Sequence, residues 1–300
     1  EHGRTSHEVL RCADVALHRA KLAPGTAVAW APELDEHTPE RLAILSDLGR
    51  AIRDGELVLH YQPRVALQYG FIEGFEALVR WRHPRLGLLS SAQFIPFAEA
   101  TEVIQPLTCW VVKAALEQLA RWSDAFPRLT MAVNISMRNL HDRACLERLA
   151  EIVREVGVDP GVVEYEMTET AIMSDPEAER TALARITDTG FRLAIDDFGT
   201  GYSSLAWLEK LPVDVLKIDR SFVSEMAEGE RSGAIVRSTI GLAHSLELGV
   251  VAEGIEDQAT ARTLRAMKCD LGQGYYFARP EPAEEAARHL GRSGWLDVPV

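Results

Sequence analysis

Residues 191–202, FRLAIDDFGTGY, constrain the fold of this chain more than any other stretch. Apolar side chains alternate through residues 191–195 in a run too short for a globular helix, which predicts a strand that ends at Asp196 and Asp197. The two glycines of the FGTG sequence allow a turn before the next helix, so the stretch predicts one strand–turn–helix unit. Two adjacent carboxylates repel each other at neutral pH unless a cation lies between them or one holds a proton. A divalent cation at this strand end is one interpretation, and a solvated loop with two aspartates is the other.

The composition is that of a globular domain that does not bind long nucleic acids. The 300 residues, 47% of them hydrophobic, are enough for a sizeable core in one large domain or two small ones. With 45 acidic against 32 basic side chains the net charge is -13, which argues against a basic footprint for nucleic acid. The 4 cysteines are scattered and form no Cys-x-x-Cys pair, which predicts reduced thiols and a cytoplasmic location.

No part of the sequence has the character of a membrane span or a targeting segment. No window approaches the roughly 18 uninterrupted apolar residues of a spanning helix. The first residues, EHGRTSHEVL, are neither a signal peptide nor a methionine start, so we expect a fragment of a longer protein. Any membrane tether of the full-length protein would then belong to the missing N-terminal region.

Strand-like and helix-like segments alternate along most of the chain. The strands expected at 57–65 and 71–81 are joined by only a few residues, so they should be antiparallel neighbours. Later connections are long enough for helices, and eight strands in all predict an α/β fold, a modified TIM (β/α)8 barrel with its first strand antiparallel. An open doubly wound sheet is the alternative, but it needs a topological switch point, and the order of the segments shows none. The other strands are expected at 130–135, 162–167, 191–197, 213–218, 249–252 and 274–277, and the helices at 39–54, 91–99, 107–124, 143–156, 176–189, 202–208, 231–246 and 258–267.

Oxygen-bearing side chains fall at the expected strand ends, where a barrel carries its active site. Hard divalent cations such as Mg²⁺ and Mn²⁺ prefer such ligands, which argues against zinc. Five carboxylates around one pore are too much negative charge for one ion, whereas two cations roughly 3.5–4 Å apart would suit in-line displacement at phosphorus. For any single residue, a polar group at the barrel mouth is the alternative interpretation. The set comprises Glu76, Asn134, Glu166, Asp196, Asp197 and Glu253, with Lys217 and Gln273 on neighbouring strands.

An ordered series of short motifs resembles the EAL domain, the family of cyclic-di-GMP phosphodiesterases. The resemblance covers about residues 45–285, and its name-giving triplet Glu76-Ala77-Leu78 lies inside FEALVRW. Residues 8–22 and 26–30 resemble the last helix and strand of a diguanylate cyclase (GGDEF) domain, although His18 stands where a tyrosine is usual. The expected domains are therefore a GGDEF-like remnant at 1–30, a linker and the start of a connecting helix at 31–44, and an EAL barrel at 45–300. The other motifs are YQP at 61–63, FIPFAE at 94–99, NIS at 134–136, EMTE at 166–169, DDFGTGYSSL at 196–205, LKID at 216–219, VAEGIE at 251–256 and QGYYFARP at 273–280.

The resemblance implies hydrolysis of one phosphodiester bond of cyclic di-GMP to linear pGpG, with Mg²⁺ or Mn²⁺ as cofactor. We expect Ca²⁺ to inhibit, because its longer and looser coordination fails to hold water and phosphate in line. The resemblance also implies that Lys217 holds or polarises the attacking water, with Glu253 as a proton acceptor and Glu76 as a further catalytic residue. A structural ion pair of Lys217 with Asp219 is the alternative. The implied ligands of one metal ion are Glu76, Asn134, Glu166 and Asp196, and those of the other are Asp196, Asp197 and Glu253. The implied substrate contacts are Gln62, Leu78, Arg80 and Gln273. For Arg80, a simple surface charge is the alternative.

The loop after Asp197 is expected to control the site, because a small shift there moves two metal ligands. Glu169 could hold this loop by accepting hydrogen bonds from the backbone amides or hydroxyls of Thr200, Ser203 and Ser204, and a simply solvated Glu169 is the alternative. In the resembling family the loop borders a dimer interface, which implies a homodimer, and the full-length protein would carry GGDEF or sensor domains upstream. Two other functions remain open from sequence: a cyclic-di-GMP receptor without hydrolysis, and a dimerisation module. The loop-control residues are Glu169, Phe198, Gly199, Thr200 and Gly201.

Overall fold

The computed structural model describes residues 39–173, 176–201, 205–226, 230–292 and 295–296, together with Val9, Ala13 and Ala16. The chain divides into two compact units, Glu1–Asp54 and Gly55–Val300. In the first unit, the helix expected at 39–54 is α2, Pro39–Asp54, and the three isolated residues are helical. The rest of the helix expected at 8–22, the strand expected at 26–30 and residues 31–38 lie outside the described residues.

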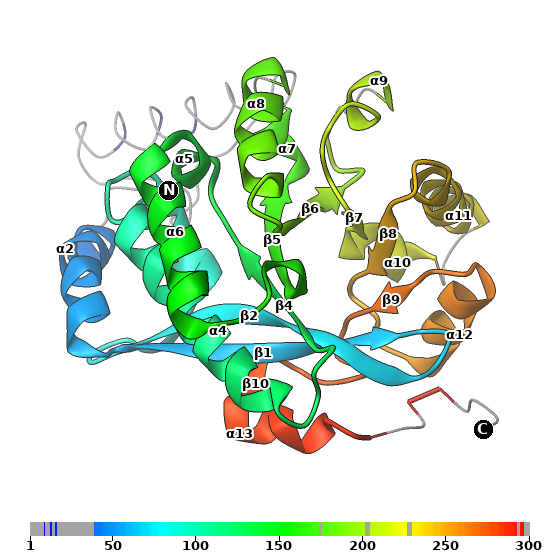
Figure 1. The fold of residues 1–300 in the computed structure, drawn as a ribbon, viewed down its shortest axis with the longest axis horizontal. Helices are drawn as coiled ribbons and strands as arrows, with labels where there is room; N and C mark the ends of the chain where they lie inside the picture. Colours follow the sequence, from blue (N-terminus) through cyan, green and yellow to red (C-terminus); the bar gives the residue numbers. More distant parts are fainter. Residues whose placement is uncertain are drawn as a thin grey trace. The chain divides into compact units, whose positions relative to one another are not determined.

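The unit Gly55–Val300 is built on a closed barrel (Figure 1). Within the described residues, eight strands follow one another around the ring in the order β1-β9-β8-β7-β6-β5-β4-β2, and pairing of β1 with β2 closes it. The short strands β3 and β10 extend the sheet from β2 and β1. The strands are β1 Leu57–Ala66, β2 Phe71–His83, β3 Gly87–Ser90, β4 Thr130–Asn134, β5 Val163–Thr168, β6 Arg192–Phe198, β7 Val215–Ile218, β8 Gly249–Ala252, β9 Leu271–Gly272 and β10 Glu281–Pro282.

Strand β1 runs against the rest of the barrel, which confirms the predicted modified TIM fold. It is antiparallel to β2, with Gln62 opposite Glu76, and antiparallel to β9, with Ala66 opposite Leu271. The other neighbours around the ring pair in parallel. The short connection between β1 and β2 turns at Gly70, whose φ of 70° is in the left-handed region that glycine adopts without strain.

The eighth strand lies earlier than predicted. The sequence pattern predicts it at 274–277, but β9 is Leu271–Gly272. The backbone after Gln273 turns instead, since the Gly274 carbonyl accepts hydrogen bonds from the amides of Phe277 and Ala278 at 3.1 and 3.3 Å. A Cβ at Gly274 would lie 2.1 Å from the Ile255 carbonyl oxygen, so this turn packs closely on the preceding loop.

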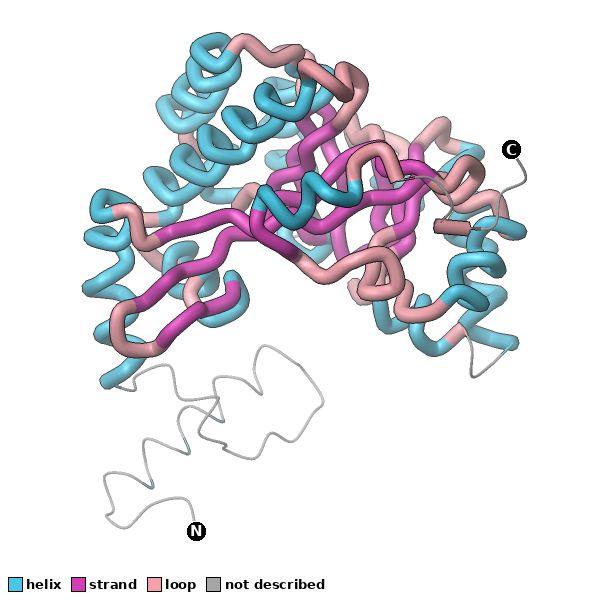
Figure 2. The backbone as a smooth tube through the Cα atoms, turned by 90° about the horizontal axis from the view of Figure 1, so that it is seen from below, coloured by secondary structure: helices cyan, strands magenta, loops and turns pink. Residues whose placement is uncertain are grey.

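Helices cover the outside of the strands, as the views along two directions show (Figures 1 and 2). The sequence codes their ends locally: Asp142 caps α6 by accepting from the amides of Ala144 and Cys145, and Gly157 ends it in a left-handed conformation. The helix expected at 91–99 is broken at Phe94 into two short pieces. The helices are η2 Ser91–Gln93, α3 Ile95–Glu99, α4 Ile104–Ser123, α5 Met137–His141, α6 Arg143–Val156, η3 Pro160–Val162, α7 Glu169–Ile172, α8 Pro176–Thr187, α9 Leu205–Leu208, α10 Arg220–Glu225, α11 Glu230–Ser245, α12 Gln258–Ala266, α13 Ala283–Ala286 and η4 Ala287–His289.

One end of the barrel interior is apolar. Five strands contribute buried residues to a single cluster there, which is what interior layers filled by alternate residues of neighbouring strands produce. Two residues after the cluster members of β6, β7, β8 and β9 the side chains are polar, namely Asp196, Lys217, Glu253 and Gln273. The cluster consists of Ala66, Ala194, Val215, Val251 and Leu271.

None of the helices that the structure describes combines the length and the apolar character that a membrane span requires.

Candidate active site

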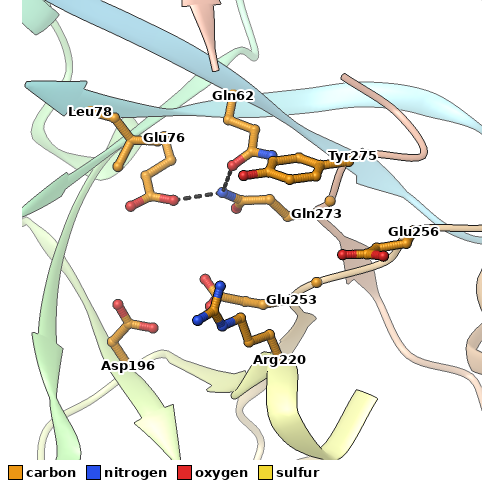
Figure 3. A pocket seen from close by; sticks show the side chains of 11 residues that line it. Gln62, Glu76, Leu78, Asp196, Arg220, Glu253, Glu256, Gln273 and Tyr275 are labelled. Carbon is orange, nitrogen blue, oxygen red and sulfur yellow. Dashed lines mark hydrogen bonds between the residues drawn. The ribbon is translucent and has the colours of Figure 1, made fainter. Parts of the chain in front are cut away.

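The strand ends bring most of the predicted site residues around one cavity. Asn134 is the last residue of β4 and pairs with Glu166 on β5, and Thr168 at the end of β5 pairs with Asp196 on β6. Because these strands are parallel, their carboxyl ends lie together. Lys217 lies on β7, the next strand of the ring after β6, and its side chain reaches the same place. The cavity is lined by Gln62, Glu76, Leu78, Asp196, Arg220, Glu253, Gly254, Glu256, Gln273, Gly274 and Tyr275 (Figure 3).

Lys217 forms ion pairs with three carboxylates. Its Nζ lies 2.8 Å from Glu166 Oε2, 3.1 Å from Asp196 Oδ1 and 2.7 Å from Glu253 Oε1, and the side chain is 1% exposed. Burial acts to lower the pKa of Lys217, but the surrounding carboxylates outweigh it and raise the pKa well above its usual value. Asp219, the other partner considered from sequence, instead caps α10 by accepting from the Ser221 amide. The ammonium group is therefore part of the acidic cluster and keeps its proton.

A chain of hydrogen bonds fixes Glu76 from both sides. Asn134 Nδ2 donates to Glu76 Oε1 at 2.8 Å, and Gln273 Nε2 donates to Glu76 Oε2 at 2.6 Å. Gln273 Nε2 also donates to Gln62 Oε1 at 3.0 Å, and Gln62 Nε2 donates to the Ala278 carbonyl. Burial acts to raise the pKa of Glu76, but Lys217 and these hydrogen bonds outweigh it and lower the pKa. Glu76 is thus held in one position and in its ionised form.

The other carboxyl groups carry more negative charge than Lys217 balances. Burial raises the pKa of Glu166 well above its usual range, although Lys217 opposes the shift. Burial and Asp196 raise the pKa of Asp197 to about 6. Burial also raises the pKa of Glu253 to about 7. A bound cation would offset the mutual repulsion of these carboxylates. The side chains offer the oxygen ligands that Mg²⁺ and Mn²⁺ prefer.

Three carboxylates are close enough to share a metal ion. Ligand oxygens of Asp196, Asp197 and Glu253 all lie within 4.8 Å of one another. Asp197 has a φ of 54°, unusual for a residue with a side chain, at an irregularity in the pairing of β6 with β7. Strain of this kind is found where a site demands a particular side-chain direction. The residues present therefore fit a divalent cation.

Two predicted substrate residues differ in where they lie. Leu78 lines the cavity. Arg80, two residues further along β2, does not belong to the lining set, and its Nη1 donates to the Val79 carbonyl at 2.9 Å. Sequence analysis missed Arg220, Glu256 and Tyr275 in the lining, although two of them lie inside the VAEGIE and QGYYFARP motifs.

Glu169 contacts the loop that follows Asp197. Its buried carboxylate accepts hydrogen bonds from the amides of Gly199 at 2.7 Å and Gly201 at 3.4 Å. The expected donor Thr200 bonds instead to the Asp197 carbonyl through its hydroxyl, at 2.8 Å. Ser203 and Ser204 lie outside the described residues. Glycine is required at 199, where φ is 101° and a Cβ would lie 2.8 Å from the Phe222 ring.

Comparison with known proteins places this fold and site in a family. Residues 45–280 match the model of the EAL domain, so the chain belongs to the EAL domain family. The chain is 38% identical over 269 residues to cyclic di-GMP phosphodiesterase PA2567 of Pseudomonas aeruginosa, covering 88% of this chain and 46% of that protein. It is 34% identical over 284 residues to cyclic di-GMP phosphodiesterase PdeR of Escherichia coli, covering 94% of this chain and 43% of that protein. The chain thus spans less than half the length of these curated relatives.

A solved structure agrees with this assignment. The PaMucR phosphodiesterase in complex with c-di-GMP is similar to this chain with a TM-score of 0.78 and 38% sequence identity. The similarity covers 81% of this chain and 99% of that one. The resemblance seen in the sequence is therefore confirmed for the EAL family, whereas no comparison shows a GGDEF remnant upstream.

Proposed function

We propose that this domain is a metal-dependent phosphodiesterase that hydrolyses cyclic di-GMP to linear pGpG. Relatives of the same family carry the name cyclic di-GMP phosphodiesterase, and one solved relative holds c-di-GMP. The observation that carries the proposal is the cluster of Glu166, Asp196 and Glu253 around the Lys217 ammonium group at the carboxyl ends of the strands. A receptor that only binds the nucleotide has no need for this costly concentration of buried charge.

The proposed metal ligands divide into two sets that share Asp196. Bound Mg²⁺ or Mn²⁺ would supply Lewis-acid stabilisation of the phosphodiester and lower the pKa of a water molecule. The compact group of Asp196, Asp197 and Glu253 supports the second set, and the fixed carboxylate of Glu76 supports the first. The first set is Glu76, Asn134, Glu166 and Asp196, and the second is Asp196, Asp197 and Glu253.

Lys217 and Glu253 have distinct roles in this proposal. Lys217 Nζ keeps its proton, so it can donate a hydrogen bond to a water or a phosphate oxygen but cannot act as a base. Glu253 is the better proton acceptor, because a carboxyl group with a pKa of about 7 is matched to a reaction near neutral pH. Gln62, Leu78 and Gln273 line the same cavity and would contact the substrate. Arg80 would have to leave its bond with the Val79 carbonyl to join them.

The decisive test is nucleotide turnover. The protein is incubated with cyclic di-GMP and Mn²⁺, and pGpG is measured by chromatography. We expect hydrolysis by the wild type and its loss in Glu76→Gln, with Glu284→Gln on an exposed turn of α13 as the matched control. Nucleotide binding without hydrolysis would make the domain a receptor, and no binding at all would leave only a dimerisation role.

The loop after Asp197 is the proposed point of control. The amides of Gly199 and Gly201 in this loop donate hydrogen bonds to Glu169 at the start of α7. Ordering of the loop would therefore position Asp196 and Asp197 at the end of β6. We propose that the homodimer contact lies at this loop. We also expect a cytoplasmic location and upstream signalling domains in the full-length protein. Ca²⁺ should inhibit, because its looser coordination fails to hold the reacting groups in line. Sedimentation of the wild type and Glu169→Ala tests whether association depends on the loop.

A further inference from the structure

Two cysteines that are far apart in the sequence lie next to each other where α4 packs against α6 (Figure 1). Cys109 on α4 and Cys145 on α6 share a hydrogen bond between their thiol groups. Both are free thiols; Cys145 is buried, and Cys109 is partly exposed. Neither has a part in the proposed hydrolysis. Two thiols in contact, one of them open to solvent, meet the first requirement for a disulfide, which is that the sulfur atoms can approach without movement of the backbone.

A buried asparagine fixes the geometry of this pair. Asn139 on α5 is fully buried. Thr108, the residue before Cys109, donates a hydrogen bond from its Oγ1 to Asn139 Oδ1 at 3.1 Å. Asn139 Nδ2 in turn donates to Cys145 Sγ at 3.4 Å. One amide group thus bridges α4 and α6 beside both cysteines and holds the Cys145 sulfur at the contact between the helices.

Cys145 is the more reactive of the two thiols. It lies in the first turn of α6, where the helix N-terminus favours a thiolate. The hydrogen bond with Cys109 lowers the pKa of Cys145 to about 7, against the effect of burial, and the bond from Asn139 acts in the same direction. The same hydrogen bond, together with burial, raises the pKa of Cys109. Because the thiolate is the nucleophilic form, Cys145 is the better nucleophile and Cys109 retains its proton.

We propose that Cys109 and Cys145 are a redox-active pair that a hydroperoxide converts into a disulfide between α4 and α6. The Cys145 thiolate attacks a peroxide oxygen, so that an S–O bond forms, the O–O bond breaks, and the leaving oxygen takes a proton from water. The Cys109 sulfur then attacks the resulting sulfenic acid, so that the S–S bond forms and the S–O bond breaks. The departing hydroxide takes the Cys109 proton and leaves as water. The two thiols lose two electrons, which reduce the hydroperoxide to an alcohol and water, and a thiol reductant reverses the bond.

The contact with Asn139 connects this pair to the proposed metal site. Asn139 Oδ1 accepts a hydrogen bond from the Ser136 amide at 3.3 Å. Ser136 caps α5 and follows Asn134, at the end of β4, after a single residue. A covalent bond draws the Cys145 sulfur toward Cys109 and so changes its hydrogen bond with Asn139. Oxidation therefore loosens the start of α5 and the position of Asn134, and this step alone rests on the proposed function.

The test locates the disulfide directly. The full chain carries Cys12→Ser, so that the cysteines of the described residues are the ones that remain. This parent protein is treated with hydrogen peroxide, freed of the peroxide by desalting, alkylated and digested with trypsin. By mass spectrometry we expect peptide 86–113 joined to peptide 144–148, and we expect the two to separate after treatment with a thiol reductant.

Single variants distinguish a specific pair from general oxidation. Cys109→Ser and Cys145→Ser should each abolish the link, and the first changes a partly exposed position that tolerates a hydroxyl group. Cys269→Ser is the matched control, since it removes a fully buried thiol outside the pair, and it should keep the link.

Mn²⁺ binding reports the connection to the metal site without any need for turnover. Measured by calorimetry, the affinity of the oxidised parent should be about 3- to 10-fold weaker than that of the reduced protein, less than the roughly 10- to 100-fold that loss of a direct partner of a metal ligand costs. Reduction should restore it. In Cys145→Ser the atom that contacts Asn139 cannot be oxidised, so peroxide should leave the affinity of this variant unchanged.

Absence of the linked peptides in the parent would overturn the pair, and so would a link between the same peptides that persists in Cys109→Ser. A disulfide that leaves the Mn²⁺ affinity unchanged would overturn the connection through Asn139. Hydrolysis of cyclic di-GMP is scored separately. A parent protein that forms the link but hydrolyses no nucleotide with Mn²⁺ would support the pair and refute the proposed function.

Discussion

Replacing Arg64 on β1 with methionine should destabilise the barrel strongly. Its Nη1 lies 2.6 Å from Glu164 Oε1 and 3.5 Å from Glu166 Oε1, and all three side chains are at most 1% exposed. Without Arg64, the nearest cation to Glu164 is Arg192, at 3.8 Å and partly exposed. Removing one partner of a buried ion pair leaves an uncompensated charge and costs about 3–5 kcal/mol.

The cost can be measured by urea titration and thermal unfolding. For a unit of this size, 1 kcal/mol corresponds to roughly 2–4 °C, so Arg64→Met should lower the melting temperature by about 6–20 °C. The double variant Arg64→Met/Glu164→Met should recover most of the loss, because an apolar pair of similar volume has no charge to desolvate. Arg143→Met, which breaks the exposed pair with Glu147 on α6, should barely move the midpoint.

The reasoning fails if the single variant loses less than about 1 kcal/mol. It fails equally if the double variant is as unstable as the single one, since the destabilisation would then come from lost packing of the long arginine stem and not from the stranded carboxylate. Comparing the two variants therefore separates charge from volume.

Three further outcomes are expected. Lys217→Ala should lower kcat far more than it raises KM, because a donor to the attacking water or phosphate acts mainly in the transition state; an unchanged kcat with raised KM would move it to substrate binding. Mn²⁺ affinity, measured by calorimetry, should fall as the pH drops from about 8 to about 6, since carboxyl groups at Asp197 and Glu253 with pKa values raised to about 6 and about 7 gain protons there that a cation must displace; a flat profile would contradict this. Glu169→Ala should need more Mg²⁺ for half-maximal turnover and recover partly at excess Mg²⁺, and identical titration curves would show that Glu169 does not hold the metal site through Gly199.

Much of the fold was predictable because the barrel strands have local patterns. The apolar run that ends at Asp196 and Asp197 became β6, and the short link between the first two strands required the antiparallel pair that is found. The eighth strand was misplaced because strand propensity at 274–277 reflects aromatic side chains and not backbone pairing. Gly274 accepts two local hydrogen bonds there, and a tertiary contact with Ile255 decides the turn.

The candidate site was predictable where chemistry and position coincide. A carboxylate at a strand end stands out in a sequence, and Glu166, Asp196 and Glu253 are found around one lysine. Arg220 gave no such signal, because it begins a short helix. Its place at the cavity depends on close packing against Gly254, which a larger residue would prevent. Arg64 gave none either, since an arginine in a strand is ordinarily read as exposed and its buried partner is a hundred residues away.

The reversed direction of β1 explains why one strand supplies both an amide at the mouth and a cation deeper in the barrel. Along β6 to β9, a step of two residues leads from the apolar cluster to the polar mouth, as from Val215 to Lys217. Along β1 the same step leads inward, because the strand runs the other way. Gln62 is therefore beside Gln273 at the mouth, Arg64 reaches Glu164 in the middle, and Ala66 belongs to the apolar cluster. A β1 running parallel to its neighbours would reverse this order, placing Ala66 at the mouth and an amide among apolar side chains, so the antiparallel strand and the polar mouth depend on each other.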